Sequence, residues 1–354
     1  MRLLRLLVAL VLFEFVVACS THSQMDSTIS PLSAGINPSQ AQHHASHSGF
    51  GTFETFAIPG CTNNYCQPLG MSIGIDKRVW FANYIGGTID SVNISGSFRV
   101  HNVDGAKNLN NYDVAEGLNR TTWFTAFGGG QGWVGHLAQG SVTLYPISFG
   151  SYFIARGFQD MWFAGGNNIA KISQTGRLKT FVLDPNSNVE VLVHGPDGNM
   201  WFTDEYFQGS LIQSRIGKIT PMGKVTEFVV PDNPPGGIIG ITVGPDNNLW
   251  FTDGSVTNGV TMIGRCTIDG SITLYPTPTT HANAWAIVKG PSNDLYFTET
   301  GVGQIGRITL NPVTITEYKV PSPATNPLGI ALGADNNIWF TIPGEGLIGK
   351  FNTH

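Results

Sequence analysis

An aromatic pair recurs along this chain at nearly regular intervals, and this repeat restricts the possible folds more than any other feature. Successive pairs are separated by 43, 39, 39, 49, 46 and 43 residues. Repeats of about 40 to 50 residues built from strand-like segments are typical of propeller blades with four strands each. The pairs are Trp80-Phe81, Trp123-Phe124, Trp162-Phe163, Trp201-Phe202, Trp250-Phe251, Tyr296-Phe297 and Trp339-Phe340. Seven pairs predict an all-β fold, a seven-bladed β-propeller with four-stranded antiparallel blades.

The stretch "GPDGNMWFTDE", residues 195–205, shows how one repeat is built. Pro196 and Asp197 suit the central positions of a turn, and Gly198 can take the positive φ that closes a short hairpin loop. The aromatic pair that follows occurs in all seven repeats, so we expect it to pack in the core between blades. The sequence therefore predicts a hairpin of the first two strands, centred on Asp197.

The two ends of the repeat region predict how the ring closes. The last repeat ends at "LIGKFNTH", after its third strand, and so lacks the fourth. The missing strand should resemble "VTEFVVP", and "GTFETFAIP" at residues 51–59 matches it. We therefore expect an N-terminal strand to complete the last blade, which removes an open sheet edge. The predicted propeller spans residues 51–354.

The segment before the propeller predicts export. Residues 1–19 have a positively charged start, an apolar middle and a small residue before Cys19, as in the signal peptide of a bacterial lipoprotein. A plain signal peptide with a coincidental cysteine, or a membrane anchor, is the alternative. Residues 20–50 are rich in Ser, Gln and His and are predicted to be a flexible tether, although its three histidines are a possible metal site. Those histidines are His43, His44 and His47.

Composition and cysteine spacing add further constraints. The net charge is −5 and no Lys/Arg cluster follows the first residues, so nucleic-acid binding is not expected. Cys61 and Cys66 lie five positions apart, and in an exported protein either a local disulfide or two free thiols are compatible with this spacing. Cys266 is expected to be a buried small residue. We expect a monomer.

Counting outward from each hairpin turn predicts a cluster of acids at the channel mouth. The count places Asp204 opposite Glu190 and, in the next two repeats, Asp253 opposite Ile239 and Glu299 opposite Trp285. First strands line the channel of a propeller, so Glu190, Asp204, Asp253 and Glu299 are predicted to form an acidic side of one mouth. The other repeats place small, apolar or aromatic residues at the same level. Amides and one aromatic residue complete the predicted rim, namely Asn188, Asn283, Trp285 and Asn326.

Two interpretations of the acids are open. Grouped carboxylates repel one another, which raises the pKa of one of them or attracts a cation. Oxygen ligands suit Mg²⁺ or Ca²⁺, so a divalent ion is one possible cofactor. Alternatively, the acids accept hydrogen bonds from loops at a wet rim. A pocket with polar groups on its rim would in either case suit a small molecule, a peptide or a glycan.

The blades "GPDGNMWFTDE…RIGKITPMGKVTEFVVP" and "GPSNDLYFTET…QIGRITLNPVTITEY" resemble those of the virginiamycin B (streptogramin) lyase family. The resemblance covers residues 51–354. It implies elimination on a cyclic depsipeptide, with Mg²⁺ held by carboxylates and a histidine base at the channel mouth. Glu299 matches the family's glutamate, whereas Asn283 and Trp285 stand where the family has Glu and His. Ile239 stands where it has a further His.

Three functions follow as hypotheses. The first is an exported ligand-binding relative that lacks the usual catalytic histidine. The second is a metal-dependent lyase or hydrolase acting at the acidic mouth, with His281 and Glu299 as candidate catalytic residues. Lipidation of Cys19, which would anchor the protein to a membrane, is expected independently of the hypothesis. The third is a scaffold for protein partners. The absent histidines favour the first hypothesis over the second.

Overall fold

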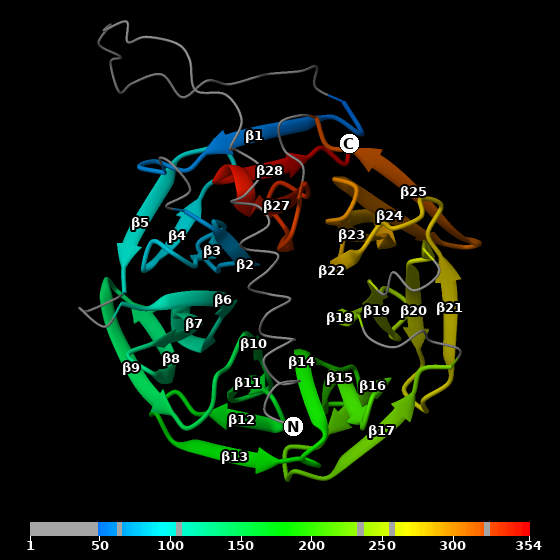
Figure 1. Cartoon of the computed structure of the whole chain (residues 1–354). Helices are drawn as coiled ribbons and strands as arrows, with labels where there is room; N and C mark the ends of the chain where they lie inside the picture. The colour runs from blue at the N-terminus through cyan, green and yellow to red at the C-terminus, as the bar shows by residue number, and fades with distance from the viewer. Residues whose placement is uncertain (1–48, 62–65, 104–107, 232–236, 255–258, 322–325) are drawn as a thin grey trace, which may run out of the picture.

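The computed structural model shows a closed ring of seven β-sheets around a central axis (Figure 1). It describes residues 49–61, 66–103, 108–231, 237–254, 259–321 and 326–354. Within these residues each sheet has four antiparallel strands, with the first strand innermost. The predicted seven-bladed β-propeller is therefore confirmed. The expectations for residues 1–19, for Cys19 and for His43, His44 and His47 lie outside the described residues.

The first three blades follow one another along the chain. Blade one consists of β2 (Pro68–Ile73), β3 (Val79–Asn83), β4 (Thr88–Val92) and β5 (Phe98–Asn102). Blade two consists of β6 (Asn110–Glu116), the 3₁₀ turn η1 (Leu118–Arg120), β7 (Thr122–Gly128), β8 (Gln131–Ala138) and β9 (Ser141–Ile147). Blade three consists of β10 (Phe153–Arg156), β11 (Met161–Gly165), β12 (Asn168–Ile172) and β13 (Leu178–Val182).

The next three blades repeat this order. Blade four consists of β14 (Ser187–His194), β15 (Met200–Gln208), β16 (Leu211–Ile219) and β17 (Val225–Val229). Blade five consists of β18 (Ile238–Val243), β19 (Leu249–Asp253), β20 (Met262–Cys266) and β21 (Ile272–Pro276). Blade six consists of β22 (Ala284–Lys289), η3 (Pro291–Asn293), β23 (Leu295–Glu299), β24 (Gln304–Leu310) and β25 (Val313–Lys319).

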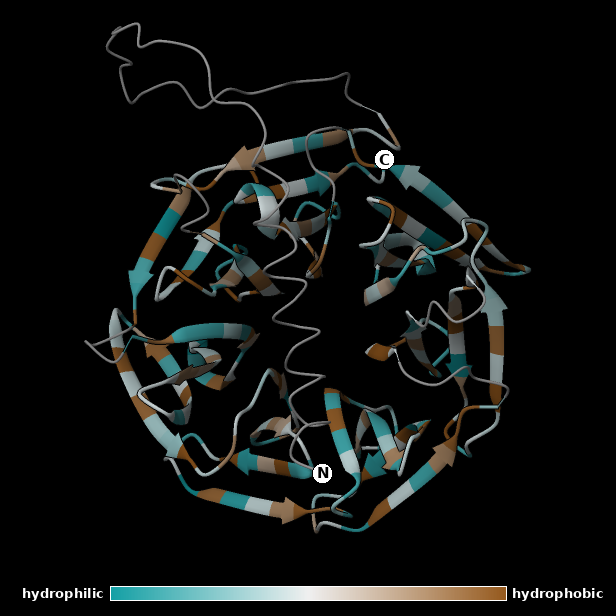
Figure 2. Ribbon diagram, in the orientation of Figure 1, coloured by the Kyte–Doolittle hydropathy of each residue, from teal (hydrophilic) through white to brown (hydrophobic). Residues whose placement is uncertain are grey.

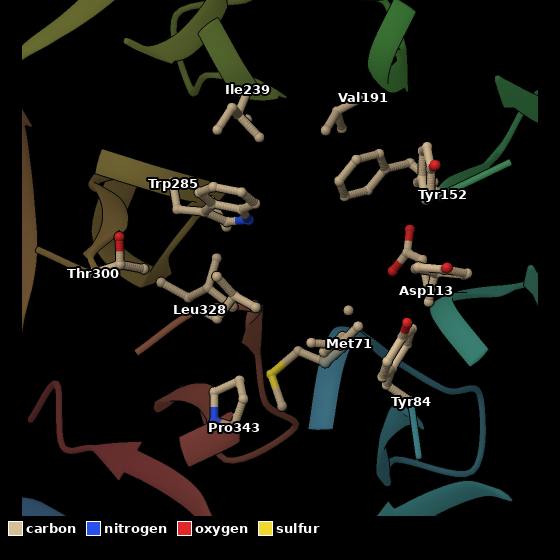
Figure 3. A pocket seen from close by; sticks show the side chains of 18 of the residues that line it. Met71, Tyr84, Asp113, Tyr152, Val191, Ile239, Trp285, Thr300, Leu328 and Pro343 are labelled. Carbon is tan, nitrogen blue, oxygen red and sulfur yellow. The ribbon is translucent and has the colours of Figure 1, made fainter. Parts of the chain in front are cut away.

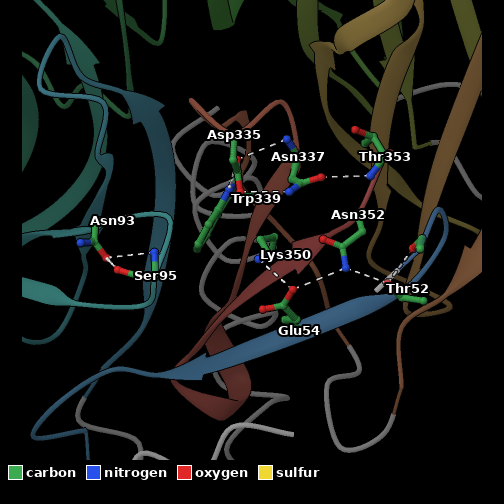
Figure 4. Close-up of polar contacts among 11 residues, drawn as sticks. Thr52, Glu54, Asn93, Ser95, Asp335, Asn337, Trp339, Lys350, Asn352 and Thr353 are labelled. Atoms are coloured by element: carbon green, nitrogen blue, oxygen red, sulfur yellow. Dashed lines mark hydrogen bonds and ion pairs between the residues drawn. The ribbon is translucent and has the colours of Figure 1, made fainter. Parts of the chain in front are cut away.

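Blade seven joins the two ends of the described chain. It consists of β26 (Ile330–Leu332), β27 (Ile338–Ile342), η4 (Pro343–Glu345), β28 (Leu347–Phe351) and, as its outer strand, β1 (Phe53–Ala57). Strand β1 pairs antiparallel with β28, from Phe53 opposite Phe351 to Ala57 opposite Leu347. Lys350 and Glu54 form an ion pair of 2.8 Å across this junction (Figure 4). The predicted closure by the N-terminal strand is confirmed.

In four blades the hairpin turn is held by the tryptophan of the aromatic pair. In blade four, Nε1 of Trp201 donates to Oδ1 of Asp197 at 2.9 Å, and Trp80, Trp250 and Trp339 make the same bond to the aspartate four positions earlier. The indole of Trp201 lies on Gly195, where a Cβ would be only 2.2 Å from it. Glycine opens the turn because no other residue leaves room for the ring.

The phenylalanine of each pair packs in the core, as expected. All seven are fully buried, and in five blades the ring lies on a glycine of the third strand, as Phe202 lies on Gly217. Each core cluster combines residues of two neighbouring blades; one joins Trp201 of blade four to Phe251 of blade five. Figure 2 shows hydrophobic and hydrophilic residues alternating along the outer strands, as expected for strands with one buried face.

A β-bulge shapes the innermost strand of most blades. In β14, β18, β2, β22 and β6 the pairing with the second strand shifts by one residue. In blade five, Ile238 pairs with Asp253 and Ile241 with Phe251, which leaves Ile239 and Gly240 at the bulge. A bulge re-aims the side chains at its position, and here it directs them toward the central channel.

In four blades the threonine of the "WFT" segment connects the start of the first strand to the next blade. In blade five, Oγ1 of Thr252 accepts from N–H of Gly240 at 2.9 Å and donates to the carbonyl oxygen of Trp285 in blade six at 2.7 Å. Thr203, Thr298 and Thr341 make the same two bonds in their blades. These threonines are fully buried.

The described residues contain one disulfide and one free cysteine. Cys61 and Cys66 form a disulfide with Cα atoms 5.3 Å apart, which is one of the two states that the spacing left open. Cys266 is a buried free thiol, as expected. Among the described residues there is no helix whose length and hydropathy would let it span a bilayer.

We expect Thr252→Val to destabilise the protein by about 1–3 kcal/mol, because it leaves a buried N–H and a buried carbonyl without their shared partner. Threonine and valine have nearly the same shape, so the loss in unfolding free energy measures the contribution of the hydroxyl group. Urea unfolding measures it, with Thr273→Val on the outer strand β21 as a control, expected within about 0.5 kcal/mol of wild type. Equal stability of Thr252→Val and wild type would contradict the role of the hydroxyl.

Candidate functional site

The first strands of the blades surround a cavity of about 360 Å³ (Figure 3). Six blades each supply a lining residue, at the bulge of the first strand or, in blades three and seven, just before that strand. These residues are Leu69, Tyr112, Tyr152, Ile239, Trp285 and Leu328. In blade four the bulge position holds Glu190, and the next residue, Val191, lines the cavity instead. The volume lies at the small end of the range for ligand pockets.

One wall of the cavity is apolar. It is formed by Val191, Ile239, Trp285, Leu328 and Pro343 from blades four to seven. In Figure 3, Trp285, Leu328 and Pro343 lie together on one side, with Ile239 and Val191 beside them. The side chains of the first four are half-buried, so they can contact a molecule in the cavity. This wall offers a ligand apolar contact and no ionisable side chain.

The opposite wall carries three tyrosines. Tyr84, Tyr112 and Tyr152 come from blades one, two and three and form a row in which each ring meets the next edge to face. The ring centroids are 5.2 Å apart for Tyr84 and Tyr112 and 4.9 Å apart for Tyr112 and Tyr152. Burial raises the pKa of Tyr112 and of Tyr152 above the ordinary value, so both are neutral phenols at neutral pH.

Asp113 lies within this tyrosine wall. Its carboxylate points toward the cavity between Tyr152 and Tyr84 (Figure 3). Its Oδ2 accepts a hydrogen bond from the N–H of Ile154 at 3.1 Å. Gly70 of blade one makes room for it, because a Cβ there would lie 1.9 Å from Oδ1. Burial raises the pKa of Asp113 to about 7, and the bonds from backbone N–H groups limit that rise.

The predicted cross-strand pairs of the acids are wrong by one residue. Asp204 pairs with Val189, Asp253 with Ile238 and Glu299 with Ala284, because the bulge shifts the register. The second strand lies behind the first, and the side chains at these positions are 0–1% exposed. Among the described residues, Glu190, Asp204, Asp253 and Glu299 are all absent from the lining of the cavity. The acidic mouth predicted from blades four to six is therefore not formed.

Two of these acids lie close together inside blade four. The N–H of Asn188 donates to Oδ1 of Asp204 at 2.7 Å, and its side-chain amide donates to Oε1 of Glu190 at 2.5 Å. Burial raises the pKa of Glu190 to about 8, and repulsion from Glu205 adds to the rise. Burial and repulsion from Glu227 raise the pKa of Asp204 to about 7. Asn188 thus connects the two carboxyl groups away from the cavity.

Glu299 is fully buried in blade six. Among the described residues neither of its carboxyl oxygens has a hydrogen-bond partner. Burial raises its pKa to about 9, and the neighbouring Glu317 adds to the rise. Glu317 itself accepts from the N–H and the hydroxyl of Thr279. At neutral pH, Glu299 is therefore a neutral acid inside the blade.

The acids were also predicted to hold a divalent ion. No three His, Cys, Asp or Glu side chains gather into a metal site within the part of the chain that the structure describes. Asp204 and Glu299 are neutral or partly neutral at pH 7 because of their burial, whereas a metal ligand must be ionised. The four residues do not fit a Mg²⁺ or Ca²⁺ held jointly at the cavity.

The remaining predicted site residues have mixed positions. Trp285 and Asn326 line the cavity, whereas Asn188 and Asn283 do not. His281 is exposed on the loop before β22, where its N–H donates to the carbonyl of Gly259, and it is not a lining residue. A candidate base at His281 therefore does not reach the cavity in this structure.

Asp113 and Tyr84 were missed by sequence reasoning. Aligning the first strands on their bulges places Asp113 where other blades have Gly70, Gly240, Ala286 or Gly329. Once the bulge is known, an acid at a position that holds glycine or alanine in these blades marks Asp113 as a candidate site residue. Tyr84 follows the last residue of β3, outside the hairpin that the counting considered.

The pH dependence of stability tests the state of Glu299. Its pKa in the folded protein is about 9, against an ordinary 4.5. A carboxyl group whose pKa is raised by folding contributes stability that is complete below its pKa in the unfolded chain. This stability is lost as the pH rises through its pKa in the folded protein. We expect Glu299→Gln to be the more stable form near about pH 9, by about 1–3 kcal/mol, and close to wild type near about pH 5.

Urea unfolding at the two pH values measures this difference. Glu345→Gln, a change at an exposed carboxyl of η4, is the matched control and should follow wild type at both. If Glu299→Gln and wild type differ by the same amount at both pH values, Glu299 is not held as a neutral acid.

Comparisons with known proteins agree with this architecture. Residues 147–354 match the model of the virginiamycin B lyase family. A streptogramin B lyase structure superposes with a TM-score of 0.75 at 31% identity, covering 86% of this chain and 98% of that one. The virginiamycin B lyase of Staphylococcus aureus gives a TM-score of 0.72 at 28% identity, covering 84% and 98%.

A catalytically inactive variant of the Staphylococcus aureus enzyme, solved with quinupristin, gives a TM-score of 0.72 at 28% identity, covering 84% of this chain and 99% of that one. No curated protein sequence matches the chain. The family model spans more than half of the chain, and the likeness to the lyase structures extends over most of it. The chain therefore belongs to the virginiamycin B lyase family.

Proposed function

We propose that this protein binds a small molecule, or an apolar portion of a cyclic peptide, in its central cavity without performing the elimination reaction. The single observation that carries the proposal is the pair Ile239 and Trp285. Both line the cavity at bulge positions, and both stand where the family resemblance implies histidines. An indole and an aliphatic side chain supply apolar contact area but accept no proton.

The relatives support a ligand for this fold. One of the solved relatives carries quinupristin, and this chain has a cavity at the axis of the same fold. The cavity combines an apolar wall with a few polar groups opposite, which is the usual composition of a small-molecule site. A cavity of about 360 Å³ holds a small molecule or one ring of a larger one.

The proposal includes no divalent cation. The acids expected to hold one are buried and are not among the described residues that line the cavity. A metal-dependent lyase or hydrolase would need several ionised ligands near the bound molecule. Among the described lining residues Asp113 is the single carboxylate, and no histidine lines the cavity.

Quinupristin, the ligand in one relative's structure, is a suitable first probe. Isothermal titration calorimetry with the full chain should detect binding, and Trp285→Ala should weaken it at least about tenfold, equivalent to about 1.4 kcal/mol. Phe158→Ala is the matched control, because this ring is 78% exposed and is not a lining residue.

The same samples test for turnover by chromatography and mass spectrometry. Elimination would open the ring without changing the mass, whereas hydrolysis would add one water. We expect neither product. A new species of unchanged mass would show that the lyase reaction is retained, and the absence of any binding would show that quinupristin is not a ligand class for this cavity.

We further propose that the protein is exported and anchored to a membrane through a lipid on Cys19. The charged start, the apolar run and the small residue before Cys19 support the proposal, as does the Cys61–Cys66 disulfide. Mass spectrometry of the mature protein from a bacterial host should find acylated Cys19 as the first residue, and Cys19→Ala should leave the membrane fraction. A mature chain that begins at another residue would rule out the anchor.

A further inference from the structure

The tyrosine wall contains a carboxylate that has no cationic partner among the described residues that line the cavity. Asp113 is the one acid among the described residues that line the cavity, and no Lys, Arg or His lines it. No ion pair of the described residues involves Asp113. A carboxylate in a mainly apolar cavity is costly unless an opposite charge or several hydrogen bonds stabilise it. The missing positive charge is therefore one that a ligand can supply.

The three tyrosines beside Asp113 also favour a cation. The face of an aromatic ring carries negative electrostatic potential and attracts an ammonium group within about 6 Å of its centre. The planes of neighbouring rings in this row differ by 65° and 80°, so the row turns around the wall and does not stack flat. All three phenols and Asp113 are half-buried and in reach of the cavity.

We propose that Asp113, Tyr84, Tyr112 and Tyr152 form a site for an organic ammonium group, with the rest of the ligand lying on the apolar wall of Ile239 and Trp285. The ligand class is an amphipathic amine, tertiary or quaternary. This inference rests on the proposed function, because it assigns a chemical group to the ligand of the same cavity. It deepens that proposal because it assigns a positive charge to the ligand and names the residues that would hold this charge.

The groups around Asp113 determine how binding of a cation depends on pH. Besides the three phenols, Glu190 on β14 lies beside Tyr152, and Asp90 on β4 is buried inside blade one. Both are acids, so neither competes with the ligand for the carboxylate of Asp113. Burial places the pKa of Asp113 at about 7, and a bound cation favours the ionised form. Binding of the cation should therefore strengthen as the pH rises from about 5.5 to about 8.

Choline and its uncharged carbon isostere, dimethylbutanol, form a matched pair of probes, because they differ in charge and hardly in shape. Titration calorimetry with the full chain near about pH 8 should show that choline binds at least about tenfold more tightly. This preference should shrink near about pH 5.5. Asp113→Asn should abolish it, since the amide oxygen can still accept from Ile154 while the charge is gone.

Asp160→Asn is the control variant. It also removes one negative charge, but Asp160 pairs with Lys171 away from the cavity, so the preference for choline should remain. Tyr84→Leu should weaken choline about two- to fivefold while sparing the isostere, as expected for the loss of one cation–π contact.

The outcomes separate the two proposals. Equal binding of choline and its isostere by wild type, or an unchanged preference in Asp113→Asn, would overturn the ammonium site even if quinupristin binds. If quinupristin does not bind but choline binds with the expected preference, the ammonium site is supported and quinupristin is excluded as a ligand of the cavity. If neither choline nor quinupristin binds, both proposals fail.

Discussion

The hydroxyl of the "WFT" threonine is the interaction on which the geometry of the channel depends. It fixes the bulge of its own blade by accepting from the backbone, and it fixes the next blade by donating to a carbonyl, as Thr252 does with Gly240 and Trp285. That carbonyl belongs to the residue whose side chain faces the cavity. The hydroxyl that joins two blades thus also fixes the backbone from which a lining side chain projects into the cavity. Because it bonds to backbone atoms, the lining side chain can change without loss of these bonds.

The sequence predicted the ring but not the site, for reasons that particular residues make clear. The aromatic pairs, the turn at Asp197 and the strand at residues 51–59 are local signals that recur, and the structure confirms what they predicted. The pairing of Glu190 with Asp204 assumed a regular hairpin, and the bulge shifts it to Val189. No residue type in the first strands predicts a bulge of this kind. One shifted residue moved the predicted acids from the cavity to the interior of the blades.

The two groups of acids consequently have different physical roles. Glu299 and its neighbour Glu317 share the interior of blade six, where burial keeps a proton on Glu299. Asp113 is half-buried and lines the cavity, and Gly70 leaves the space that its carboxylate needs. The polar side of the channel is thus formed by blades one to three and the apolar side by blades four to seven. This reverses the arrangement expected from the position of the acids in the sequence.

The pairing of β1 with β28 has a consequence for how the ring is completed during synthesis. Thr52 and Asn352 are bonded to each other although they stand 300 positions apart. The strand that is made first must therefore remain unpaired until the last strand has emerged, and the ring closes only as the final event. Contacts of such high sequence separation slow folding because the whole intervening chain must be ordered first. An incomplete chain exposes an open edge on blade seven, which distinguishes unfinished molecules from finished ones.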